Sequence, residues 1–115
     1  MGMKWTKGEM KVATKDGVIA TVFGTRFGPL GVFKKHEDDR YCVVHAATGL
    51  RATTLNKLGD AKKVVEYLCS VFLPSFDTPN PDEMHPPHCV ILWLRRMLCS
   101  GKWEEPPTLI EVLCE

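Results

Sequence analysis

The 115-residue sequence lacks any apolar run long enough to cross a membrane, since its longest run is Cys89 to Leu94. No segment like a signal peptide opens the chain, and none of its five cysteines forms a C-x-x-C pair. These absences predict reduced thiols in a cytoplasmic protein with no membrane partner. The net charge of +1 also excludes a globally basic surface for nucleic acid or anionic lipid.

The composition is that of a globular protein, with 44% hydrophobic and 25% charged residues. A chain of this length buries a core without disulfide or metal crosslinks. We therefore expect a single domain over 1–115, with a sheet at 9–55, a helix at 60–73 and C-terminal helices at 87–114.

The first half reads as an antiparallel sheet. Two alternating apolar runs flank Asp16 and Gly17, and an Asp-Gly pair in this position favours a hairpin with a two-residue type I′ turn. Breakers and polar turns separate further runs of apolar residues. The predicted strands lie at 9–15, 18–24, 30–35, 40–47 and 50–55.

The last two of these strands meet at Thr48 and Gly49. A two-residue turn there would place His45 opposite Ala52. Both faces of the resulting hairpin then carry apolar residues, so the pattern does not select the face that meets the core.

Helical spacing of apolar residues predicts an amphipathic helix over 60–73, with Asp60 as N-cap and Pro74 ending it. A second helix is expected at 87–99, closed by Gly101. A capping-box pattern predicts a short helix at 108–114. Together these elements predict an α+β fold, with an antiparallel sheet of four to five strands packed by an amphipathic helix.

Two clusters have the residue types of a chemical site. His85, His88 and Cys89 could bind zinc with a further cysteine. His45 could act as the base for a nucleophilic thiol of Cys42 or Cys89. The spacing favours exposed imidazoles and a buried thiol in the first case, and a hydrogen-bonded strand histidine in the second. We therefore expect no cofactor, no metal and no enzymatic activity, and leave open whether the first cluster binds a metal.

Basic residues concentrate between positions 26 and 63, with aromatic residues among them. Such a sheet surface could bind nucleic acid or an acidic protein surface. The Trp93 helix is apolar almost all round, so it could form a homodimer or partner interface as well as part of the core. The residues expected to contact a partner are Arg26, Lys34, Lys35, Arg40, Arg51, Lys62, Lys63 and Trp93.

The segment YCVVHAATGL at 41–50 has the pattern aromatic-x-V-x-H-x-x-T-G-L and precedes a helix. Together with GPLGVF at 28–33, it resembles small accessory proteins encoded by phages and prophages. The resemblance covers 28–72, and Ala47 stands where those proteins often have proline. It implies a protein that acts by binding, with host defence complexes and nucleic acid as the typical targets.

From this resemblance we expect a non-enzymatic, anti-CRISPR-like accessory protein in the host cytoplasm. It would inhibit or modulate a host defence protein or ribonucleoprotein complex by protein–protein contact. The alternative is a small nucleic-acid-binding protein that uses the basic sheet surface.

Overall fold

The structure, a computed structural model, describes residues 4–114 and contains a five-stranded antiparallel sheet with helices. The strands follow one another in the order β1-β2-β3-β4-β5, and the sheet does not close into a barrel. The predicted α+β class is confirmed. In chain order the elements are β1 (Trp5–Ala13), β2 (Ile19–Phe27), β3 (Leu30–Lys34), β4 (Tyr41–His45), β5 (Arg51–Leu55), α1 (Leu58–Phe76), the 3₁₀ turn η1 (Pro81–Glu83), α2 (His88–Ser100) and α3 (Leu109–Leu113).

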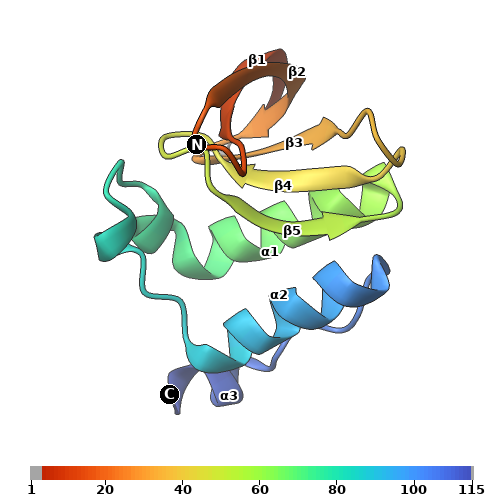
Figure 1. The fold of residues 1–115 in the computed structure, drawn as a ribbon. Coiled ribbons are helices and arrows are strands. Elements are labelled where there is room, and N and C mark those ends of the chain that lie inside the picture. The colour runs from red at the N-terminus through yellow and green to blue at the C-terminus, as the bar shows by residue number, and fades with distance from the viewer. Residues whose placement is uncertain (1–3, 115) are drawn as a thin grey trace.

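Helices α1 and α2 lie side by side on one face of the sheet (Figure 1). Their apolar stripes pack on alternate residues of β3, β4 and β5, as the pleat of a strand requires. Burial of this surface from water provides the main stabilisation of the fold. The most deeply buried side chains of this main core are Trp93, Leu30, Leu55, Leu68, Met97, Val32, Val43, Val64, Val65 and Val90.

The opposite face of the sheet is also covered, because the β1–β2 hairpin bends over it (Figure 1). Met10 and Val12 from β1 pack there against Phe33, Cys42 and Val44. This second core explains why both faces of β4 carry apolar residues: one face meets the helices and the other meets the hairpin.

Two glycines allow the hairpin to lie this close. A Cβ added to Gly31 would lie 2.2 Å from the sulfur of Met10, and one added to Gly24 would lie 2.3 Å from the backbone oxygen of Val32. Contacts this short are sterically forbidden, so a side chain at Gly31 would displace the Met10 side chain, and one at Gly24 would displace the backbone of β3.

A third glycine ties the end of β1 to the β4–β5 turn. The Ala13 N–H donates to the Gly49 carbonyl at 2.8 Å, and Gly49 has a φ of +75°. A Cβ at Gly49 would lie 3.0 Å from the Ala13 nitrogen. Both the left-handed backbone and the close approach therefore require glycine here.

Two predicted turns are wrong in detail. At the first hairpin, Thr14 N–H donates to the Val18 carbonyl, and only Gly17 has a positive φ. The connection is thus a three-residue loop with a left-handed glycine rather than a type I′ turn. In the β4–β5 connection, the His45 N–H donates to the Leu50 carbonyl, so His45 pairs with Leu50 and not with Ala52 as predicted.

The longer β4–β5 loop goes with a change of register along the two strands. Val43 pairs with Thr53 while Val44 pairs with Arg51, so β5 contains a bulge. Because of this bulge, Thr53 and Leu55 share the face of Val43, whereas the predicted register placed them on the other face.

Helix α1 is longer than predicted at both ends. It begins at Leu58 with Lys57 as N-cap, so Asp60 lies in the first turn and does not cap it. Pro74 lies inside the helix, and the backbone departs from helical geometry at Phe72. A proline lacks the N–H for one helical bond, which accounts for a kink rather than a termination. The predicted glycine at the end of α2 and the Thr108–Glu111 capping box are confirmed.

Candidate functional site

The clearest candidate for a binding surface is the half of β2 that pairs with β1 but not with β3. β2 pairs with β3 only from Gly24 to Phe27, whereas Ile19–Phe23 pairs with β1 alone. This segment is called the free edge below. Val18, Ile19 and Phe23 have 61%, 55% and 69% of their surface exposed, so it presents apolar side chains to solvent.

The hydrogen-bonding pattern between β1 and β2 determines which backbone groups of the free edge are unpaired. The bond from Thr14 N–H to Val18 O marks that pair as hydrogen-bonded, and such pairs alternate along an antiparallel ladder. The backbone N–H and C=O groups of Ala20 and Val22 therefore form hydrogen bonds with β1. The N–H and C=O groups of Ile19 and Thr21 point away from β1, toward an edge with no partner strand in the described chain.

A cavity of about 400 Å³ lies between the free edge and the β3–β4 turn. Ala20, Val22 and Phe33 line it with apolar surface, while Lys35 and Arg51 contribute positive charge. Its rim also contains Lys15, His36 and the carboxylates of Asp16 and Glu37. Lys35 makes an ion pair with Asp38 at 3.4 Å. No ion pair involves Arg51 among the residues that the structure describes.

A second hollow, of about 230 Å³, opens on the outer side of the same edge. Phe23 and Tyr41 line it together with Lys7, Lys34 and Lys62. Lys34 makes an exposed ion pair with Asp39 at 3.6 Å, and Lys62 lies over the Trp5 ring at 5.1 Å from its centroid. Basic and aromatic side chains thus meet on both sides of the free edge.

The structure separates the other predicted basic residues. Arg26 donates to the Gly28 carbonyl at 2.8 Å, and Lys63 lies over Trp103. Arg40 is half-buried, and its guanidinium donates to the carbonyls of Thr54 and Leu98. It therefore links the β-sheet to α2 and is a structural residue. The predicted partner-binding set does not form one surface: Lys35 and Arg51 meet at the cavity, and Lys34 and Lys62 meet at the outer hollow.

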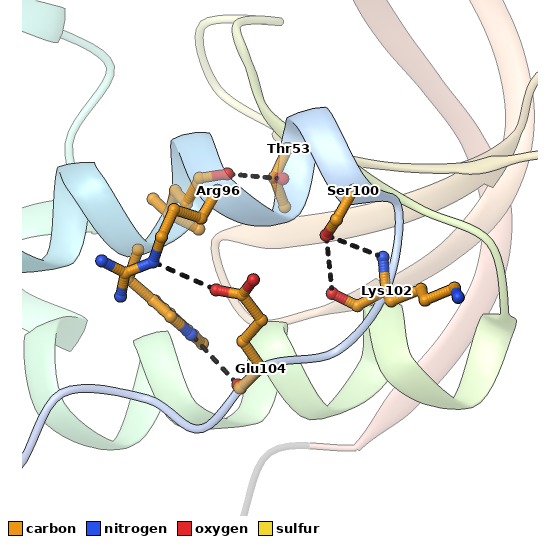
Figure 2. Close-up of polar contacts among 7 residues, drawn as sticks. Thr53, Arg96, Ser100, Lys102 and Glu104 are labelled. Atoms are coloured by element: carbon orange, nitrogen blue, oxygen red, sulfur yellow. Dashed lines mark hydrogen bonds and ion pairs between the residues drawn. The ribbon is translucent and has the colours of Figure 1, made fainter.

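Trp93 is fully buried, so the prediction that it contacts a partner is wrong. Its indole N–H donates to the Glu104 backbone carbonyl at 3.1 Å, and the Arg96 guanidinium donates to the Glu104 carboxylate (Figure 2). The nearby Thr53 hydroxyl donates to the Leu94 carbonyl at 3.0 Å and joins α2 to β5. A homodimer through this helix could use only its outer side, where Leu92 and Leu98 are partly exposed.

His45 and Cys42 lie on opposite faces of β4 and do not form a catalytic pair. His45 is buried against α1, where one ring nitrogen meets the Phe76 carbonyl and the other meets the Thr48 hydroxyl. Because a carbonyl only accepts, the nitrogen facing Phe76 carries the proton. Burial raises the pKa of Cys42 to about 11, although Arg51 opposes this shift. A thiol with that pKa is protonated at neutral pH and is a poor nucleophile.

The His85, His88 and Cys89 cluster does not assemble a metal site. His85 and His88 are exposed, and no three His, Cys, Asp or Glu side chains within residues 4–114 are arranged to hold a metal ion. Within the same range, no helix is long and apolar enough to cross a membrane.

Comparisons with known proteins return no match: no protein-family model, no curated protein and no solved structure is significantly similar to this chain. The resemblance to phage accessory proteins therefore stays a prediction. The free edge was missed in the sequence, although a signal for it was present. The run VIATVF at 18–23 has no charge and no proline, the residues that usually protect an exposed strand edge.

Proposed function

We propose that this protein acts by binding, as a phage-type accessory protein that inhibits or modulates a host defence complex through protein–protein contact. The observation that carries this proposal is the free edge of β2, where apolar side chains and unpaired backbone groups are exposed together. Monomeric proteins usually protect such edges, so an unprotected one is a contact surface for another chain.

The surroundings of the free edge fit a protein partner. Lys35 and Arg51 on one side and Lys34 and Lys62 on the other provide charges at the rim of an apolar strip. An apolar centre within a polar, charged rim is the usual composition of a protein–protein interface. The rim charges would steer an acidic partner and increase its association rate.

The test is a defence assay in cells. The chain is expressed in a host whose CRISPR or other defence system restricts a phage, and the plaquing efficiency of that phage is measured. An inhibitor restores plaquing, and Phe23→Asp, which places a charge in the apolar strip, removes the effect. Thr6→Asp, at an exposed position of the neighbouring strand, serves as the matched control. Unchanged restriction across a panel of defence systems would contradict the proposal.

A second candidate function is binding of single-stranded nucleic acid. It is favoured by the outer hollow, where exposed Phe23 lies among Lys7, Lys34 and Lys62. Aromatic rings beside lysines can stack bases and neutralise phosphates. Such binding would weaken steeply with added salt. Retention on single-stranded DNA that does not change between low and moderate salt would exclude it.

A further inference from the structure

We infer that the free edge of β2 binds an extended segment of its partner as an added β-strand, and that this segment alternates apolar and acidic residues. The inference rests on the proposed protein-binding function and specifies how the same surface would work. It concerns the free edge together with the cavity behind it.

The backbone supplies the first part of the argument. Ile19 and Thr21 each have one N–H and one C=O directed away from β1, and the described chain provides no strand to pair with them. An added strand can form main-chain hydrogen bonds to these groups without displacing any existing pair. The free edge is about 17 Å long at ~3.4 Å per residue, which suits a segment of about five residues.

The sequence of the edge supplies the second part. Natural edge strands are blocked by charges, prolines or bulges. Ile19–Phe23 contains none of these, and its register with β1 is continuous. The edge is therefore uncharged and has no bulge that would disturb pairing with an added strand.

The position of the cavity determines the chemistry of the partner. Alternate side chains of an added strand point to opposite faces. On the outer face they would meet the exposed side chains of Ile19 and Phe23, which favours apolar residues. On the inner face they would enter the cavity lined by Lys35 and Arg51.

The cavity carries an excess of positive charge for an incoming strand. Its lining contains Lys15, Lys35 and Arg51 against Asp16 and Glu37. Lys35 is already paired with Asp38, whose carboxylate is exposed, and single pairs that are open to solvent on one side contribute little stability. Arg51 has no ion-pair partner among the described residues and is the main anchor for a carboxylate. The inner residues of the partner segment are therefore acidic.

The same charges argue against a second copy of this chain as the occupant. Pairing two free edges would bring uncharged strands together. It would supply no carboxylate to Lys35 and Arg51 in either cavity. The edge itself is also short for a stable dimer, whose interface needs more than about 1,000 Å². An acidic partner segment satisfies both the backbone groups and the cations.

The experiment uses capped peptides of sequence Val-Glu-Val-Glu-Val and, as the matched control, Val-Lys-Val-Lys-Val. Binding to the full chain is followed by NMR shifts and by hydrogen exchange of backbone amides. The glutamate peptide is expected to bind and to protect the Ile19 and Thr21 amides, while the lysine peptide does not. Equal binding of both peptides, or shifts confined to other strands, would overturn the inference.

Three variants separate the backbone and charge contributions. Thr21→Pro removes the central free N–H and is expected to abolish binding, while Thr21→Val retains it. Because a proline could disturb folding, Arg51→Glu tests the cavity independently. Reversing this exposed charge should reduce the affinity for the glutamate peptide by about tenfold. If Thr21→Pro folds and binds normally, or Arg51→Glu has no effect, the inference is wrong.

The outcomes also separate this inference from the proposed function. If plaquing is restored equally by the wild type and Thr21→Pro, the protein inhibits host defence but strand addition is wrong. If the peptide binds as described while no defence system is inhibited, the site stands and the host-defence role is wrong. A dimer that protects the same two amides without peptide would show that a second copy occupies the edge. If single-stranded DNA displaces the glutamate peptide and protects the same two amides, the edge binds nucleic acid instead.

Discussion

The contact between Met10 and Gly31 gives a sharp test of how the hairpin is held over the sheet. Gly31→Ala would place a methyl carbon 2.2 Å from the Met10 sulfur, in a core where Met10 is only 6% exposed. Overpacking of this kind costs about 1–3 kcal/mol. Alanine also restricts the unfolded chain more than glycine does, which stabilises the folded state by about 0.4–1 kcal/mol. We therefore expect a net loss of roughly 1–2 kcal/mol in the free energy of unfolding.

The cost should depend on Met10. Met10→Ala alone leaves a cavity and is expected to cost about 2–3 kcal/mol, at the lower end for a buried methionine. In that background the added methyl group no longer meets the Met10 sulfur and only a contact of 3.3 Å with the Thr25 backbone oxygen remains, so Gly31→Ala should cost much less. The double variant is then less destabilised than the sum of the single variants by about 1–2 kcal/mol.

Urea unfolding with an unchanged m-value measures each free energy. Gly24→Ala is the control, because a Cβ there would also lie 2.3 Å from the backbone oxygen of Val32, which Met10→Ala does not remove. Its cost should therefore persist in the Met10→Ala background. Additive costs of Gly31→Ala and Met10→Ala, within about 0.5 kcal/mol, would refute the described packing.

Two further predictions concern the turn glycines and the thiols. Gly17 and Gly49 both have a φ of +75°, but only Gly49 would place a Cβ near other backbone atoms. Both alanine variants should lose about 1 kcal/mol from the left-handed backbone, and Gly49→Ala should lose more in a urea titration; equal losses would contradict the tie to Ala13. Burial raises the pKa of Cys42 and of Cys69 to about 11, so at pH 8 a chromogenic disulfide should react with exposed Cys99 and Cys114 but with these two only after unfolding. Because the unfolded thiols ionise first, each buried thiol should lower stability by up to about 1.4 kcal/mol per pH unit between its ordinary pKa and about 11; stability that does not change over this range would refute the burial.

The sequence predicts the elements well because local patterns determine them. Asp16-Gly17 marks a hairpin, helical spacing marks α1, Gly101 marks the end of α2, and the Thr108 capping box marks α3. The failures depend on contacts between distant residues. The bulge in β5 and the covering of both sheet faces arise from tertiary packing, which no local pattern encodes.

The same limit applies to the candidate site. Charge clustering in the sequence singled out Lys35 and Arg51, and the structure places both in the lining of the cavity. It could not distinguish them from Arg40, whose guanidinium holds the sheet to α2. Trp93 was predicted at a partner interface but is buried in the core. Because its helix is apolar on most sides, the sequence does not indicate which side the segment around Trp103 covers.

The bending of the hairpin connects the stability of the fold to the availability of the free edge. At Gly24 β2 leaves β3, and the strand beyond it packs Ala20 and Val22 onto the second core. If the hairpin were straight, Ile19–Phe23 would continue along the sheet and that core would be exposed. Burial of Met10 and Val12 therefore stabilises the same conformation that leaves the edge unpaired. Substitutions that loosen this packing, such as Gly31→Ala, should weaken both folding and peptide binding, whereas Arg51→Glu should weaken binding alone.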